Sequence, residues 1–157
     1  MSGKKAWGRY LFFILLALGA GGISGWLSAE GMRVYSAEAQ KPPLTPPDAV
    51  FPIVWTALYV LMGIGAARVS MKGREGWKGL RIWSVQLMVN FSWSLIFFNI
   101  QAYFQALICL AVLALLVLAM ILEFFETDRR AAFMQIPYFF WLCFAGYLNF
   151  GVWMLNS

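Results

Sequence analysis

Long apolar runs dominate the chain, and five of them have the length of membrane-spanning helices. They cover residues 7–27, 49–67, 82–98, 102–125 and 133–155, and almost no charged side chain falls inside them. A helix needs about 20 mainly apolar residues to cross a bilayer. Because backbone polar groups in lipid must be satisfied within their own segment, each run is expected to be helical. The pattern predicts an all-α membrane protein, a bundle of five transmembrane helices forming one domain over residues 1–157.

The first run has a second interpretation. Basic residues precede it, and Leu27-Ser28-Ala29 at its end resembles a signal-peptidase site. A cleaved signal peptide would leave a mature chain that begins near Glu30, and the five-span prediction would then fail. Intact-mass measurement of the purified protein distinguishes the two interpretations.

Composition agrees with a membrane protein and removes several classes of function. The chain is 62% hydrophobic and 12% charged, whereas a soluble domain is about half apolar and about a quarter charged. It contains no histidine, which is the commonest metal ligand and neutral-pH acid–base group. There is also no serine or cysteine nucleophile motif, no metal cluster and no phosphate loop. We therefore expect no metal, no cofactor and no ordinary acid–base catalysis.

The net charge of +5 orients the chain in the membrane and does not indicate a nucleic-acid partner. If all five runs span the bilayer, one side carries ten basic residues and the other carries two, Arg33 and Lys41. The ten are Lys4, Lys5, Arg9, Arg68, Lys72, Arg74, Lys78, Arg81, Arg129 and Arg130. The positive-inside rule then predicts a cytoplasmic N-terminus, with the first loop and the C-terminus on the opposite side.

The connection between the first two runs is the longest loop, covering residues 30–48. Four prolines stiffen it because each fixes φ and removes an amide donor; they are Pro42, Pro43, Pro46 and Pro47. Thr45 is expected to cap the second helix, with Pro46 at its first helical position. One interpretation is a stiff connector. The other, which a long loop in a small protein favours, is a lid over a cavity.

Three spans carry aromatic and amide side chains at helical spacing. The third has Gln86, Asn90, Trp93 and Phe97, the second has Trp55 and Tyr59, and the fifth has Trp141, Ala145 and Leu148. Each set lies on one helical face, and amides in hydrocarbon need partners, so these faces should point into the bundle. Together they suggest a pocket for a flat, apolar ligand with a few polar groups. The alternative is an interfacial tryptophan belt, which suits Trp7, Trp26, Trp77, Trp83 and Trp153.

Small residues mark a second pattern in the first span. Ala17, Gly21 and Gly25 repeat every four residues along one face, which permits close approach of another helix. This stripe can serve packing within the bundle, or it can form the face of a homodimer.

Along the proline loop and the aromatic and amide faces of the second, third and fifth runs, the sequence resembles the TspO/MBR family. These are the tryptophan-rich sensory proteins that include the mitochondrial translocator protein. Three blocks carry the resemblance over nearly the whole chain. The first runs from Lys41-Pro42 through Pro46-Pro47 and Phe51-Pro52 to Trp55-Thr56-Ala57-Leu58-Tyr59, the second contains Gln86-Leu87, Asn90, Trp93 and Phe97-Phe98, and the third contains Pro137-Tyr138, Trp141, Phe144-Ala145 and Leu148-Asn149. The resemblance favours an uncleaved first span.

The resemblance implies a five-helix bundle, commonly dimeric, that binds porphyrins and other tetrapyrroles, sterols and benzodiazepine-type drugs. It implies a ligand site formed by Trp55, Tyr59, Asn90, Trp93, Phe97, Trp141, Ala145 and Leu148, under a lid with Tyr35, Pro42, Pro43, Pro46 and Pro47. The leading hypothesis is a membrane receptor or carrier for tetrapyrroles, with a role in tetrapyrrole handling or stress signalling. Two alternatives are light-dependent porphyrin degradation, in which Trp55 and Trp141 would be catalytic, and signalling through protein partners or dimer contacts.

The chain departs from the family pattern at three positions. Val34 and Leu44 stand where many relatives have tryptophan, so the lid is less aromatic. Phe150 stands where the sterol motif of animal members has tyrosine, and no basic residue follows it. That motif is weak even when intact, and its absence argues against sterol as the main ligand.

Overall fold

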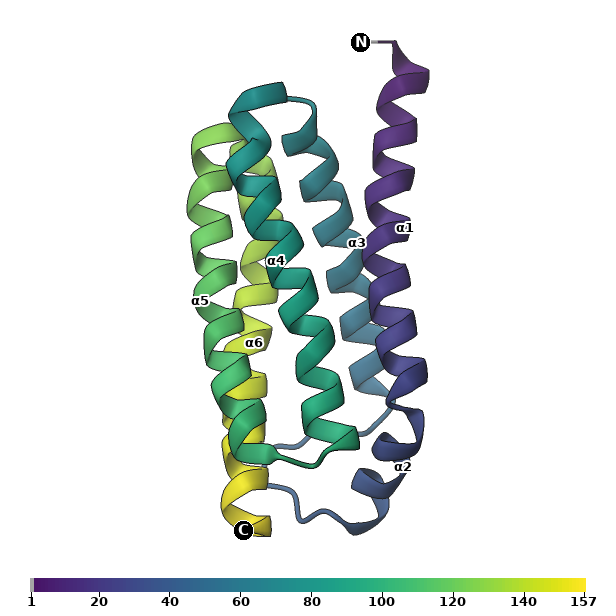
Figure 1. Ribbon diagram of the computed structural model, residues 1–157, viewed down its shortest axis with the longest axis vertical. Helices are drawn as coiled ribbons and strands as arrows, with labels where there is room; N and C mark the ends of the chain where they lie inside the picture. Colours follow the sequence, from purple (N-terminus) through teal and green to yellow (C-terminus); the bar gives the residue numbers. More distant parts are fainter. Residues whose placement is uncertain (1) are drawn as a thin grey trace.

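The computed structural model describes residues 2–157, so Met1 of the predicted domain lies outside the described residues. Within this range the chain is all-α and has no strand, which confirms the predicted class. The six helices are α1 (Gly3–Leu27), α2 (Ala29–Glu38), α3 (Val50–Ser70), α4 (Trp77–Ser94), α5 (Tyr103–Thr127) and α6 (Arg129–Asn156). A 3₁₀ turn, Gly73–Gly76, precedes α4, and a π-helical turn, Leu95–Asn99, extends it. Five long helices run side by side, and the short α2 lies at the end of the bundle that also holds the C-terminus (Figure 1).

Four of the long helices, α1, α3, α5 and α6, are long and apolar enough to cross a membrane. They cover the predicted spans 7–27, 49–67, 102–125 and 133–155 to within a residue at the edges. The remaining predicted span, 82–98, falls on α4 and its π turn. Helix α4 is less apolar than the other four long helices, because it carries Lys78 and Arg81 in its first turns and the amides Gln86 and Asn90 further along. The fifth span therefore stays a prediction.

The connection between α1 and α3 contains more structure than the prolines indicated. The predicted loop 30–48 begins with nearly all of α2, and only the following residues, 39–48, are irregular; we call these the proline segment. The predicted cap at Thr45 is wrong, because α3 begins at Val50. Leu44 has a φ of 68°, so the chain turns here, and the Thr45 hydroxyl donates to the Pro42 carbonyl at 2.6 Å within that turn.

Two glycines let α1 and α3 approach closely. The Cα of Gly21 faces the ring of Tyr59, and Gly63 on α3 faces the backbone of Ile14; neither site has room for a Cβ. Ala17 is also fully buried. Ala17 and Gly21 of the small-residue stripe therefore pack within the bundle and do not face a partner outside it.

The core contains one tryptophan that was interpreted as interfacial. Trp83 is 1% exposed, donates its indole N–H to the Met62 carbonyl at 3.1 Å and packs edge-on against Phe13. The belt interpretation is wrong for this residue, because its face of α4 turns toward α1 and α3. Trp7, Trp26 and Trp77 are exposed, as a belt position requires.

An ion pair holds the end of the bundle opposite α2. Arg68 in the last turn of α3 donates to both carboxylate oxygens of Asp128, with a shortest distance of 2.9 Å. Asp128 also caps α6 by accepting from the Ala131 amide at 3.0 Å. Partial burial opposes ionisation of Asp128, but the Ala131 amide and the Arg68 guanidinium outweigh it and hold the pKa of the carboxyl below its ordinary value.

Candidate ligand-binding cavity

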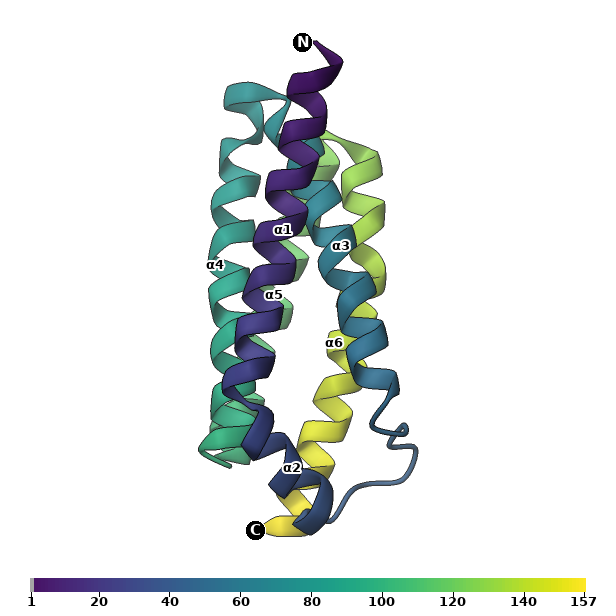
Figure 2. The same cartoon turned by 90° about the vertical axis from the view of Figure 1, so that its right-hand side faces the viewer.

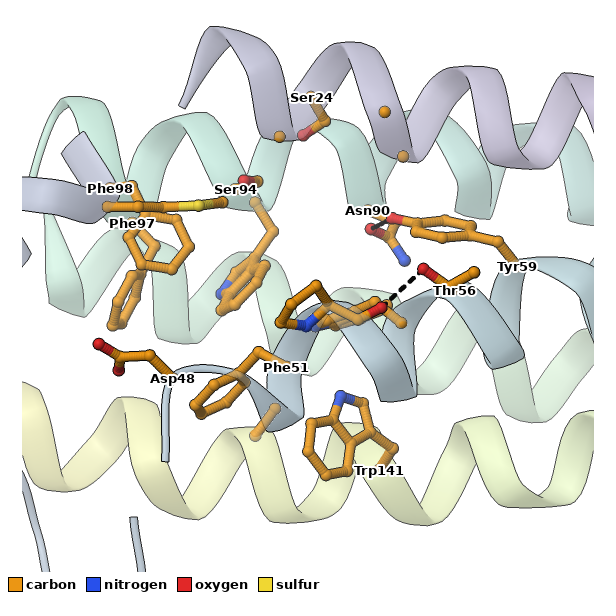
Figure 3. A pocket seen from close by; sticks show the side chains of 18 of the residues that line it. Ser24, Asp48, Phe51, Thr56, Tyr59, Asn90, Ser94, Phe97, Phe98 and Trp141 are labelled. Atoms are coloured by element: carbon orange, nitrogen blue, oxygen red, sulfur yellow. Dashed lines mark hydrogen bonds between the residues drawn. The ribbon is translucent and has the colours of Figure 1, made fainter. Parts of the chain in front are cut away.

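A cavity of about 510 Å³ lies inside the half of the bundle that α2 covers. Its volume falls within the range of about 300–1,000 Å³ typical of small-molecule sites. Side chains from α1, α2, α3, α4 and α6 line it, together with the π turn (Figure 3). All eight residues predicted for ligand binding are brought together in this lining: Trp55, Tyr59, Asn90, Trp93, Phe97, Trp141, Ala145 and Leu148.

Four aromatic side chains form one wall of the cavity, which we call the aromatic wall: Tyr59, Trp55, Trp93 and Phe97. The Trp55 ring lies 5.7 Å from Tyr59 and 6.4 Å from Trp93, tilted by about 30° from each. Trp93 lies 5.4 Å from Phe97 at a similar tilt. The spacing of four residues within each helix puts each pair on one face. The wall therefore offers successive, roughly parallel ring faces.

The orientation of Trp93 is set by α6. Its indole N–H donates to Asn149 Oδ1 at 3.1 Å, and Asn149 Nδ2 donates to the Tyr103 carbonyl at 2.8 Å. Asn149 is 1% exposed. Because both groups of the Asn149 amide are engaged, the orientation of the Trp93 ring is fixed.

Asn90 takes part in a hydrogen-bond network that links three helices. Its Oδ1 accepts from the Tyr59 hydroxyl at 3.0 Å, and its Nδ2 donates to the Tyr138 hydroxyl at 2.6 Å. Tyr138 in turn donates to Gln86 Oε1 at 2.8 Å. Both ends of the Asn90 amide thus have protein partners. Its direct effect in the cavity is to position Tyr59, which the sequence alone did not indicate.

Trp141 lines the cavity from α6 and differs from the other buried polar groups of the cavity. Its ring packs 6.0 Å from Phe51. Its Nε1 is buried and has no hydrogen-bond partner within residues 2–157, and Figure 3 shows the indole among the side chains that line the cavity. A buried N–H without an acceptor costs about 1–3 kcal/mol. The cavity lining therefore includes an indole N–H that has no acceptor within residues 2–157.

Of the five predicted lid residues, the structure brings only Tyr35 into the cavity lining. Its ring packs edge-on against Phe97 and Phe98, at 5.3 and 5.4 Å, and burial raises the pKa of its hydroxyl to about 12. Pro42, Pro43, Pro46 and Pro47 do not line the cavity. At this end α2, which the sequence analysis missed, forms the cover.

Several lining residues lie outside the predicted set. They are Leu18, Gly21, Gly22, Ser24 and Gly25 of α1, Met32 and Ser36 of α2, and Asp48, Phe51, Pro52, Thr56, Ser94, Phe98 and Asn149. Of the α1 glycines, the sequence pattern indicated Gly21 and Gly25, but as a stripe for packing within the bundle or for a homodimer face. Asp48 is the one charged side chain in this lining, and it accepts a hydrogen bond from the Ser36 hydroxyl at 2.8 Å.

The part of the chain that the structure describes contains no group of three or more His, Cys, Asp or Glu side chains positioned to bind a metal. The chemistry that the cavity offers is aromatic stacking, apolar contact and a hydrogen-bond donor.

Comparison with known proteins agrees with the resemblance seen in the sequence. The model of the TspO/MBR family matches residues 13–154. Protein CrtK of Rhodobacter capsulatus is 37% identical over 144 residues, which cover 90% of this chain and 89% of that protein. The tryptophan-rich protein TspO of Chlorobaculum tepidum is 33% identical, with 90% and 91% covered. The translocator protein of Bos taurus is 31% identical, with 93% and 88% covered.

Proposed function

The chain belongs to the TspO/MBR family of integral membrane proteins, and we propose that it is a receptor or carrier that binds a tetrapyrrole or a similar flat, apolar ligand. The observation that carries this proposal is a cavity lined by aromatic rings, one of which, Trp141, has a buried indole N–H without a partner within residues 2–157. A flat ring would stack on the aromatic wall, and an acceptor on that ring would pair with the indole.

Porphyrins meet these requirements. Their macrocycle is planar and apolar, and their peripheral carboxyl groups are hydrogen-bond acceptors. Stacking on an aromatic side chain contributes about 0.5–1.5 kcal/mol beyond the area buried. Because the chain contains no histidine, an imidazole cannot ligate iron here, and binding rests on shape, stacking and the Trp141 donor.

The test is quenching of protoporphyrin fluorescence by the purified protein. Trp141→Phe keeps an aromatic ring and removes the N–H, so the affinity should fall about five- to tenfold, the equivalent of about 1–1.4 kcal/mol. Trp26→Phe is the matched control, because Trp26 is 76% exposed and does not line the cavity. If Trp141→Ala combined with Asn90→Ala binds as tightly as the wild type, the ligand does not occupy this cavity.

A second candidate function is light- and oxygen-dependent breakdown of the bound porphyrin. It is favoured by one observation, that Trp55 and Trp141 line the same cavity. Illumination would then produce a bilin-like absorption that is lost in Trp55→Phe or Trp141→Phe. Equal product with an unrelated porphyrin-binding protein would exclude the enzymatic function.

The proposal includes α4 as the fifth span. Two features support it: its amides Gln86 and Asn90 are buried with partners, while its outward face carries apolar side chains such as Met88, which is 70% exposed. The N-terminus and the connections α3–α4 and α5–α6, which hold the ten basic residues, then share one end of the bundle (Figure 1). We infer that this end is cytoplasmic.

Homodimer formation, with signalling through dimer or partner contacts, stays a prediction. A dimer would have to use a surface other than Ala17 and Gly21, because these face the interior.

A further inference from the structure

The cavity is covered at the end where α2 lies. Tyr35 packs over it, and the proline segment is tied to α6 behind it. The Gln40 amide donates to Asn156 Oδ1 at 2.9 Å, and Asn156 Nδ2 donates back to the Gln40 carbonyl at 2.8 Å. The Tyr147 hydroxyl donates to the Pro43 carbonyl at 2.8 Å. A ligand that arrived from this end would have to displace these contacts.

The side between α1 and α3 is different. Gly22 of α1 and Pro52 and Thr56 of α3 line the cavity, and all three are exposed. Exposed lining residues on two neighbouring helices are what an opening of the cavity along this line requires. We call it the α1–α3 seam and define it by these residues and Gly25. Figure 2 shows α1 and α3 separating toward the end of the bundle that holds α2.

Glycines leave the seam open. A Cβ added to Gly22 or Gly25 would meet no other atom within 4 Å, whereas one added to Gly21 would collide with Tyr59. Closer to the start of α1, Gly63 fits against the backbone of Ile14. The two helices thus touch over one half of their length and part over the other, where α1 carries Gly22 and Gly25.

The rim of the seam suits a lipid-dissolved molecule. Gly22 lies five residues before the end of α1, about 7 Å along the helix axis, so it is within an apolar helix long enough to cross the bilayer. The Thr56 hydroxyl, the polar group of the rim, donates its proton to the Pro52 carbonyl at 2.6 Å. An apolar ring could pass from hydrocarbon into the cavity without entering water.

We propose that the cavity exchanges its ligand directly with the bilayer through the α1–α3 seam. Its natural ligand is then a molecule that partitions into lipid, and the membrane, rather than the aqueous phase, is its source. This inference rests on the proposed binding function of the cavity and adds to it the route and the physical state of the ligand.

The experiment measures association and dissociation rates of protoporphyrin IX with the full-length protein in phosphatidylcholine vesicles, by stopped-flow fluorescence. Gly22→Leu places a side chain in the seam. Both rates should fall by about tenfold, an added barrier of about 1.4 kcal/mol; a variant that only weakened binding would instead raise the dissociation rate. Gly19→Leu is the matched control: Gly19 is an exposed glycine of the same helix with open space around it, and it does not line the cavity.

Two further variants separate the seam from the covered end. Thr56→Leu narrows the seam from α3 and should slow both rates as Gly22→Leu does. Asn156→Ala releases the proline segment and should leave both rates unchanged. Wild-type rates in Gly22→Leu and Thr56→Leu would overturn the inference, as would faster exchange in Asn156→Ala. If binding by the wild type depends on Trp141 but Gly22→Leu and Thr56→Leu leave the association and dissociation rates unchanged, only the proposed route is wrong. If the wild type does not bind protoporphyrin, the proposed function itself fails.

Discussion

Replacing Tyr138 by phenylalanine should destabilise the bundle by removing one hydroxyl from the middle of the Asn90 network. Tyr138 is 1% exposed. Its hydroxyl accepts from Asn90 Nδ2 at 2.6 Å and donates to Gln86 Oε1 at 2.8 Å. Because phenylalanine preserves the packing of the ring, the loss of stability comes from these two hydrogen bonds and from the groups left unpaired.

The magnitude follows from the two bonds. Hydrogen bonds between transmembrane helices contribute about 0.6 kcal/mol on average and at most about 1.7 kcal/mol each. Without the hydroxyl, Gln86 keeps only the weak contact of its Nε2 with Met62 Sδ at 3.8 Å, and its Oε1 is left buried without a donor, which moves the cost toward the upper end. We expect a loss of about 2–3 kcal/mol for Tyr138→Phe, and about half of that for Tyr59→Phe, which removes one bond.

The free energy of unfolding is measured by circular dichroism in mixed micelles with an increasing fraction of sodium dodecyl sulfate. Tyr147→Phe is the matched control, because it removes a hydroxyl that bonds the Pro43 carbonyl at the exposed rim; its cost should be about 0.6 kcal/mol or less. If Tyr138→Phe is no less stable than Tyr147→Phe, the network does not hold α3, α4 and α6 together as described.

Three other predictions concern packing, pH and topology. Gly21→Val should destabilise the bundle by about 1–3 kcal/mol because its side chain meets the Tyr59 ring, whereas Gly19→Val, which has open space, should have little effect on thermal unfolding in detergent. The pKa of Asp128 is lowered in the folded state, so its pair with Arg68 stabilises the protein fully above the unfolded pKa of about 4. The difference in unfolding free energy between the wild type and Asp128→Asn should therefore shrink as pH falls from neutral toward about 3. A difference that is constant with pH would contradict this prediction. Single cysteines are placed in the N-terminal tail and in the proline segment of a variant without the two native cysteines. An impermeant maleimide added to intact cells should label the proline-segment cysteine and should label the N-terminal cysteine only after the cells are opened. The same labelling pattern for both cysteines would refute the five-span topology.

The sequence alone was sufficient to predict the apolar helices and the faces of α3, α4 and α6 that line the cavity. Both depend on local periodicity: Trp55 and Tyr59, or Asn90 and Trp93, lie on one face whatever surrounds them. The burial of amides followed equally directly, since hydrocarbon offers them no partner. The identity of each partner did not follow, because it depends on which helices are neighbours.

Prediction failed where a long-range contact or a turn decides the outcome. Trp83 has the composition of an interfacial residue, but its neighbours on α1 and α3 enclose it. Thr45 has the chemistry of a helix cap, but the turn at Leu44 uses its hydroxyl first. Helix α2 was hidden by the prolines that follow it, because they dominate the composition of the whole loop.

The sequence by itself determined that this is a helical membrane protein with one aromatic, amide-bearing face on each of three helices, since these properties need only the chain's own periodicity and hydropathy. Only the tertiary structure decided how those faces are used. It joins Asn90 to tyrosines 31 and 48 residues away, leaves the Trp141 indole without a partner, and separates α1 from α3 beside the cavity. The reason is physical: a hydrogen bond or an opening between helices depends on the distance and angle at which two segments meet, and no pattern within either segment encodes that geometry.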